Sequence, residues 1–105
     1  MNQDCIFCKI VAGEVPSKKA YEDSDTLAFY DIKPAAETHL VIIPKKHIST
    51  FMDLNNESQN LIRTAQIVIN EKNIASGYKI VINGGKYQEV PHFHLHLLAG
   101  KLEKP

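Results

Sequence analysis

Hydrophobic and polar positions in the first half of the chain predict one short helix and three strands. Residues 4–12, DCIFCKIVA, are expected to form a helix that begins at an Asp4 cap. Residues 18–32, KKAYEDSDTLAFYDI, predict a hairpin of two short strands around the polar EDSD. Residues 38–44, THLVIIP, predict a strand because aliphatic and β-branched residues run up to a closing proline.

The second half of the chain predicts a long helix followed by two strands. Residues 57–75 are expected to be helical and to stop before Gly77, and residues 47–54 to form a helical turn. The apolar positions at helical spacing are Leu61, Ile62, Ala65, Ile69 and Ile74. Strands are predicted at 78–82 and 93–99. Since helices and strands do not alternate regularly, the order favours an α+β domain with an antiparallel sheet.

Composition limits the possible classes of partner. A chain of 105 residues is expected to form a single domain, 1–105. Its 12 basic and 12 acidic residues cancel, so neither a nucleic acid nor a membrane is an expected partner. No apolar run approaches the ~20 residues of a membrane-spanning helix. A cytoplasmic protein with reduced cysteines is therefore expected.

The segment PHFHLHLL, residues 91–98, places three histidines at alternate positions. On a strand His92, His94 and His96 share one face. The core is expected to receive the opposite face, formed by Phe93, Leu95 and Leu97. Three clustered histidines indicate metal or acid–base chemistry more than a solvated strand face. Spacing alone leaves two possibilities, a zinc site or a neutral imidazole that acts as a nucleophile.

HFHLHLL, residues 92–98, matches the His-x-His-x-His-x-x signature and resembles the histidine-triad (HIT) superfamily of nucleotide hydrolases and transferases. Residues 6–50 resemble the N-terminal half of its Hint branch, and residues 88–100 resemble its C-terminal signature. The resemblance implies an antiparallel sheet of about five strands with one short N-terminal helix and one long helix. It also implies a homodimer.

The resemblance assigns the catalytic roles to three histidines. His94 would attack the α-phosphorus of a nucleotide, and water would then hydrolyse the nucleotidyl-histidine. An imidazole with a pKa near ~6.5 is largely neutral and nucleophilic at pH 7, which suits this role. His96 would donate to phosphate oxygens or assist the leaving group, and His39 would pack beside the triad.

The resemblance also assigns a nucleoside site. Asp31 would accept hydrogen bonds from the ribose hydroxyls, although taken alone it reads as a turn residue. Asn83 would lie near the ribose or phosphate. Glu89 stands where many members have Ser or Thr, and its carboxylate would repel phosphate and attract a cationic or amine leaving group. The purine slot would be formed by Ile6, Phe7, Ile10, Phe29 and Ile32, and the loop before the last strand would add Gln88 and Val90.

The pair Cys5 and Cys8 admits three interpretations: a redox pair, two packed thiols, or half of a zinc site. The resemblance extends to zinc-containing relatives, which include the galactose-1-phosphate uridylyltransferases. It implies that His47 and His92 complete a Cys₂His₂ set. Four protein ligands leave no position for water, so this Zn²⁺ would be structural.

These features predict a hydrolase acting on purine nucleoside 5′-phosphoramidates or adenylates. One alternative is a dinucleoside polyphosphate hydrolase, and another is a nucleotide-binding or scaffolding module with incidental catalysis. A third is a mononuclear zinc hydrolase with all three triad histidines on one metal. The cysteine pair argues against the third because it offers His92 a different coordination set.

Overall fold

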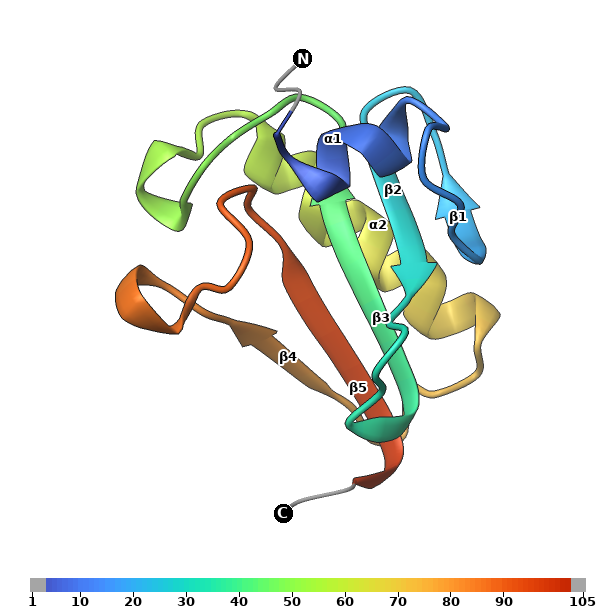
Figure 1. The fold of residues 1–105 in the computed structure, drawn as a ribbon. Helices are drawn as coiled ribbons and strands as arrows, with labels where there is room; N and C mark the ends of the chain where they lie inside the picture. Colours follow the sequence, from blue (N-terminus) through green and yellow to red (C-terminus); the bar gives the residue numbers. More distant parts are fainter. Residues whose placement is uncertain (1–3, 103–105) are drawn as a thin grey trace.

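The computed structural model describes residues 4–102 and forms one five-stranded antiparallel sheet in the order β1-β2-β3-β5-β4 (Figure 1). Its strands are β1 (Lys19–Glu22), β2 (Thr26–Tyr30), β3 (Ala36–Pro44), β4 (Lys79–Ile82) and β5 (Leu95–Leu102). The helices are α1 (Ile6–Val11) and α2 (Glu57–Glu71), with short 3₁₀ turns η1 (Phe51–Asp53) and η2 (Gly85–Tyr87). The α+β prediction is confirmed. The single domain over 1–105 stays a prediction, and its ends, 1–3 and 103–105, lie outside the described residues.

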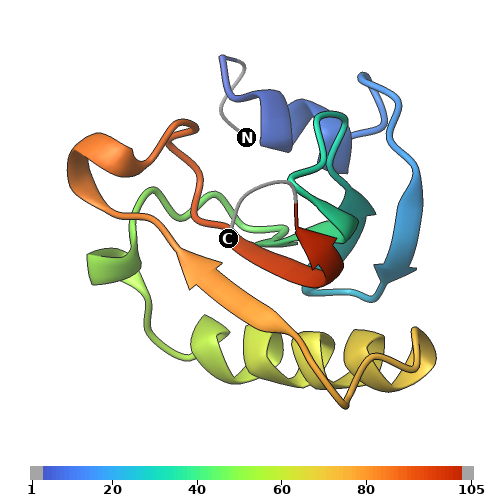
Figure 2. The same ribbon diagram turned by 90° about the horizontal axis from the view of Figure 1, so that it is seen from below.

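The two helices cover opposite faces of the sheet. Figure 2 shows α2 along one face and α1 on the other, with the strands between them. β3 is central and buried on both sides, which explains its unbroken apolar run. Leu40 and Ile42 face α2, whereas Val41 and Ile43 face α1. The core under α2 consists of Ala28, Leu40, Ile42, Ile48, Leu61, Ala65, Val68, Ile69, Phe93, Leu95 and Leu97.

Strand alternation brings the catalytic candidates to the α1 face. Leu95 and Leu97 lie in the core under α2, so His96 between them points to the other side of the sheet. His96 is paired with Val41 across β3 and β5, which puts it on the same face. His39 lies two residues before Val41 on β3 and shares that face. The predicted core role of Phe93, Leu95 and Leu97 is confirmed.

Several predicted boundaries are wrong. α1 begins after Cys5, whose Sγ accepts the Cys8 N–H at 3.4 Å, so Cys5 and not Asp4 caps the helix. α2 ends at Glu71 and not at residue 75, because Asn73 adopts φ 59° and the Ile74 N–H bonds back to the Ile69 carbonyl.

The last strand and the long helix also differ in detail. β5 begins at Leu95 and not at Phe93, because the Phe93 N–H bonds to the Ile48 carbonyl at 2.6 Å instead of joining the sheet. His92 and His94 therefore lie before the strand, and His92 is in a bend, where its N–H bonds to the Val90 carbonyl at 2.8 Å. Ile62, expected on the buried face of α2, is 58% exposed.

Within residues 4–102, neither helix has the length and apolar character that a membrane span requires.

Candidate active site

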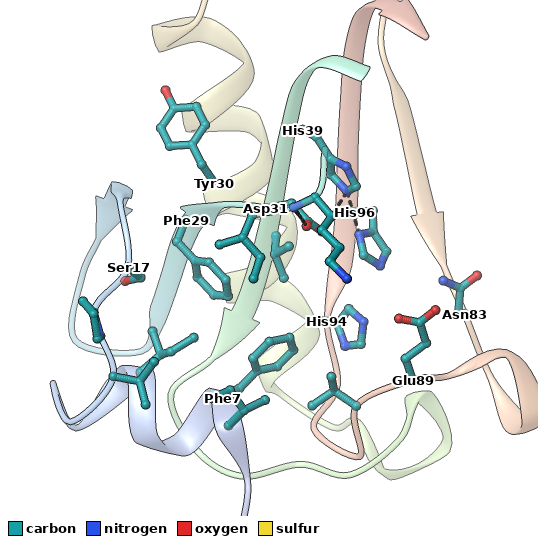
Figure 3. Close-up of a pocket in the computed structure, with 18 residues that line it drawn as sticks. Phe7, Ser17, Phe29, Tyr30, Asp31, His39, Asn83, Glu89, His94 and His96 are labelled. Atoms are coloured by element: carbon teal, nitrogen blue, oxygen red, sulfur yellow. Dashed lines mark hydrogen bonds and ion pairs between the residues drawn. The ribbon is translucent and has the colours of Figure 1, made fainter. Parts of the chain in front are cut away.

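A cavity of about 650 Å³ opens on the α1 face of the sheet. Figure 3 shows Phe7 and Phe29 on one side, Asp31, His39, His94 and His96 at the centre, and Asn83 with Glu89 beyond them. Every predicted catalytic or nucleotide-binding residue except Gln88 lines this cavity: Ile6, Phe7, Ile10, Phe29, Asp31, Ile32, His39, Asn83, Glu89, Val90, His94 and His96. The arrangement places an apolar slot and a polar reaction centre end to end.

The hydrogen bond of His94 assigns its tautomer. Its Nδ1 lies 2.9 Å from the carbonyl oxygen of His92. A carbonyl oxygen only accepts hydrogen bonds, so Nδ1 carries the proton and Nε2 keeps a free lone pair. The ring is buried, meets Phe7 edge-on at 5.1 Å between centroids, and meets His96 at 4.9 Å. Packing and hydrogen bonding therefore hold the His94 ring in one orientation.

A chain of hydrogen bonds assigns the opposite tautomer to His39 and His96, with the proton on Nε2. The Ala35 N–H donates to His39 Nδ1 at 2.9 Å, so the neutral His39 ring carries its proton on Nε2. His39 Nε2 lies 2.9 Å from His96 Nδ1, which accepts, so His96 carries its own proton on Nε2. The site thus sets an unprotonated Nε2 on His94 beside an N–H donor on His96.

Burial keeps His39 and His96 neutral. Desolvation lowers the pKa of His39 below its ordinary value, against an opposing attraction from the Asp31 carboxylate. Desolvation also lowers the pKa of His96, together with repulsion from His94 and His39, and Asp31 and Glu89 partly offset the effect. Neutral rings at pH 7 are what the tautomer assignment requires.

Asp31 lies just after β2, between the apolar slot and His96 (Figure 3). Its Oδ1 accepts the Lys33 N–H at 2.8 Å, and its Oδ2 lies 3.4 Å from His39 Nε2. A carboxylate offers about four lone-pair sites, so two remain for a ligand. Asp31 thus forms the turn contact that its sequence context suggests and also lines the cavity.

Glu89 and Asn83 lie on the far side of the histidines from the apolar slot. Glu89 precedes β5 in the loop, and Asn83 directly follows β4. Glu89 is exposed, and within residues 4–102 its carboxylate forms no ion pair with a lysine or arginine. At this end of the cavity the Glu89 carboxylate therefore has no lysine or arginine of the described residues within ion-pair distance.

Two predicted nucleotide contacts need correction or qualification. Gln88 does not line the cavity, because its side-chain amide is committed to the carbonyls of Ser49 at 2.6 Å and Val90 at 2.9 Å. It positions the loop before β5 instead. Ile32 lines the cavity but is 92% exposed, so it lies at the rim and not within a closed slot.

Cys5, Cys8, His47 and His92 come together beside this cavity. Their ligand atoms all lie within 4.8 Å of one another. His92 Nδ1 is 3.3 Å from Cys5 Sγ and 3.5 Å from Cys8 Sγ, and His47 Nδ1 is 3.2 Å from Cys8 Sγ. A tetrahedral zinc with ordinary Zn–S and Zn–N bonds separates sulfur and nitrogen ligands by about 3.6 Å. The spacing of these donors fits such an ion.

The protons of this cluster also suit a metal. His92 Nε2 lies 2.8 Å from the Pro44 carbonyl and must donate to it, which leaves Nδ1 unprotonated and facing the cysteines. Cys5 Sγ accepts the Cys8 N–H and faces the same side of the cluster as His92 Nδ1, 3.3 Å away. A second group, Asp31, His39 and His96, also has its ligand atoms within 4.8 Å of one another. It fits a metal poorly, because His39 Nε2 carries the proton that its Ala35 bond requires.

Comparison with known proteins identifies the family. The model of the HIT domain matches residues 12–103, which is most of the chain. The chain belongs to the HIT family.

Relatives of this HIT protein agree along nearly their whole length. It is 38% identical to a purine nucleoside phosphoramidase of Escherichia coli (strain K12), over 96% of this chain and 91% of that protein. A histidine triad protein from Clostridium difficile superposes with a TM-score of 0.91 at 39% identity, covering 96% of this chain and 94% of that one. A HIT family hydrolase from Legionella pneumophila Philadelphia 1 gives a TM-score of 0.87 at 44% identity, with 92% and 93% covered.

Some residues of the HIT cavity were not predicted from sequence. Val41 could have been found, since it alternates with His39 on the same strand face. The others come from the α1–β1 connection and from around the end of β2, where no periodicity indicates a direction. The cavity residues that were missed are Val15, Pro16, Ser17, Tyr30, Lys33 and Val41.

Proposed function

We propose that this HIT protein hydrolyses purine nucleoside 5′-phosphoramidates or adenylates at the α-phosphorus, through a nucleotidyl intermediate on His94. One observation carries the proposal: the free Nε2 of His94 lies beside the Nε2–H of His96, at the end of an apolar slot. A nucleophile and a hydrogen-bond donor in this arrangement can act together on one phosphoryl group.

The apolar and polar ends of the cavity favour one orientation of a bound nucleotide. A purine is apolar on its faces and fits the slot between Phe7 and Phe29. The ribose then reaches Asp31, and the α-phosphate reaches His94 and His96. The leaving group extends towards Asn83 and Glu89.

Attack by His94 Nε2 forms a P–N bond and breaks the bond from phosphorus to the leaving nitrogen or oxygen. The leaving amine departs with the bonding electron pair and takes up a proton from water. The nucleotidyl imidazole becomes cationic, and its Nδ1–H bond to the His92 carbonyl stabilises that charge. His96 Nε2–H donates to a phosphoryl oxygen in both steps. Water then attacks phosphorus and releases a proton to solvent, the P–N bond breaks, and its electron pair returns to His94 Nε2.

The charge beyond the histidines favours amines over polyphosphates as leaving groups. The Glu89 carboxylate repels an anionic leaving group and attracts an ammonium. This argues against the alternative of a dinucleoside polyphosphate hydrolase. The E. coli relative named purine nucleoside phosphoramidase supports the same choice.

A substrate panel tests this function and the role of Glu89 together. The wild type is expected to turn over adenosine 5′-phosphoramidates faster than diadenosine polyphosphates. Among phosphoramidates, it should prefer substrates whose leaving amine carries an additional ammonium group. Glu89→Gln should lower kcat/KM for the cationic amine about five-fold relative to a neutral amine of equal length, since a solvent-exposed charge pair contributes little more.

A matched variant, Glu14→Gln, removes an exposed carboxylate that does not line the cavity and should leave the preference unchanged. If wild type hydrolyses none of the panel but binds nucleotides, the binding-module alternative becomes the better account. An unchanged preference in Glu89→Gln would remove Glu89 from leaving-group selection.

We further infer that the chain is a zinc-containing, Hint-like member. The Cys₂His₂ cluster carries this inference, and all four donors would hold one Zn²⁺. When bound, the ion would have a structural role, because its bonds to the four donors would tie the start of α1 to the segments around His47 and His92. The ion would thereby hold the segment that ends in the proposed nucleophile.

A second copy of the chain is the proposed partner, through the β4 edge. β4 is the last strand of the sheet, and α2 packs mainly against β1, β2 and β3. Ile80 and Ile82 pair with Leu97 and Leu95, so they share the α2 face of the sheet, yet they are 45% and 44% exposed.

Ile80→Lys is expected to convert a dimer to a monomer in sedimentation experiments, whereas Lys79→Arg should not. An unchanged mass for Ile80→Lys would contradict this interface.

A further inference from the structure

The single proton on His39 Nε2 faces two acceptors. His96 Nδ1 lies 2.9 Å away and Asp31 Oδ2 lies 3.4 Å away, as the dashed lines of Figure 3 indicate. The other nitrogen of His39 is occupied by the Ala35 N–H. His39 therefore cannot serve both acceptors with separate protons. A change that weakens the attraction of the Asp31 carboxylate for this proton strengthens the hydrogen bond from His39 Nε2 to His96 Nδ1.

The same carboxylate lies where the ribose must pass. Asp31 stands between the apolar slot and the histidines (Figure 3). Beside its hydrogen bond from the Lys33 N–H and its 3.4 Å contact with His39 Nε2, its carboxylate has lone pairs left for two hydroxyl donors. A diol that donates to Asp31 satisfies Oδ2 and spreads the carboxylate charge over new hydrogen bonds. Its attraction for the His39 proton then falls.

We propose that Asp31 is a positioning residue that couples occupation of the ribose subsite to the orientation of His96, an inference that rests on the proposed function. Without a nucleoside, the His39 N–H is shared between His96 and Asp31. With the ribose bound, the N–H belongs to His96 alone. This fixes the His96 ring with its Nε2–H towards the α-phosphate. The ribose hydroxyls therefore contribute to kcat and not only to binding.

A nucleoside without a phosphate tests the coupling directly. Adenosine fills the base and ribose subsites but has no phosphate to touch His94 or His96. In ¹⁵N-labelled wild type, saturating adenosine is expected to move the Nδ1 resonance of His96 and the Nε2 resonance of His39. Saturating 2′,3′-dideoxyadenosine should leave both unmoved. Asp31→Asn should abolish the response to adenosine, whereas Asp25→Asn, the same change at an exposed residue outside the cavity, should retain it.

Kinetics supply the second readout. With 2′,3′-dideoxyadenosine 5′-phosphoramidate, wild-type kcat is expected to fall about ten-fold, less than the loss of a whole phosphoryl-binding donor would cost. In Asp31→Asn the ribo and dideoxy substrates should have equal kcat. A dideoxy substrate with a raised KM and unchanged kcat would overturn the coupling and leave Asp31 as a simple ribose contact.

The two proposals fail in different ways. Movement of the His39 and His96 resonances without any turnover would remove the hydrolase and leave the coupling standing. Turnover without a resonance response to adenosine would do the reverse. Failure of adenosine to bind, or equal responses to adenosine and dideoxyadenosine, would overturn the coupling because the ribose would not engage Asp31.

Discussion

His94→Asn is expected to lower kcat for an adenosine 5′-phosphoramidate on the order of 10⁴-fold or more, since loss of a nucleophile leaves only the binding and donor contributions. Asparagine suits the test because its side-chain amide N–H can replace the Nδ1–H bond to the His92 carbonyl, which is 2.9 Å long in the wild type. The variant therefore loses the attacking Nε2 but keeps the local hydrogen bond. Single-turnover kinetics separate the loss of chemistry from any change in binding.

The control for this variant is nucleotide affinity and thermal stability. Both should stay close to wild type, because the base slot and Asp31 are untouched. His96→Gln should lose less activity than His94→Asn, since it removes a donor and not the nucleophile. Equal turnover by His94→Asn and wild type would remove His94 from the chemistry.

Cys5→Ser is expected to eliminate bound zinc and to destabilise the protein by about 3 kcal/mol, because metal binding to the folded state alone adds directly to folding stability. For a domain of this size that corresponds to a fall in Tm of roughly 10–20 °C. Serine is a strong N-cap residue, so the cap that Cys5 supplies to α1 is preserved and the loss reports on the metal. Metal analysis and thermal unfolding provide the two measurements.

A chelator supplies the matched control for the zinc prediction. Wild type treated with chelator should unfold at the same temperature as Cys5→Ser, and the variant should not respond to chelator. The competing interpretation treats Cys5 and Cys8 as packed thiols, both buried in the cluster under α1. That interpretation predicts zinc-free wild type and no chelator effect, and either result would contradict the metal site.

The sheet and the identity of the clustered histidines could be predicted from sequence because local periodicity encodes them. The apolar run of β3 is typical of a strand buried on both faces, and the alternation of His96 with Leu95 and Leu97 specifies one face. Boundaries set by tertiary contacts could not be predicted. β5 starts at Leu95 because a backbone bond from Phe93 reaches Ile48, far away in the sequence. Periodicity contains no signal for such a bond.

The candidate site shows the same division. His39, His94 and His96 were expected in one site, but the proton on each ring depends on distant backbone groups such as Ala35 N and His92 O. Gln88 was expected to contact the nucleotide, and its amide is instead held by Ser49 and Val90 carbonyls. A sequence motif therefore identifies residue types in a site, whereas their hydrogen-bonding roles emerge only from the folded geometry.

Stereochemistry at phosphorus distinguishes covalent catalysis by His94 from direct attack by water. An adenosine 5′-phosphoramidate made chiral at the α-phosphorus with oxygen isotopes would be hydrolysed in isotopically labelled water. Attack by His94 and then by water inverts the configuration twice, so net retention is expected in the nucleoside monophosphate. Net inversion would mean that water attacks phosphorus directly and that no nucleotidyl intermediate forms on His94.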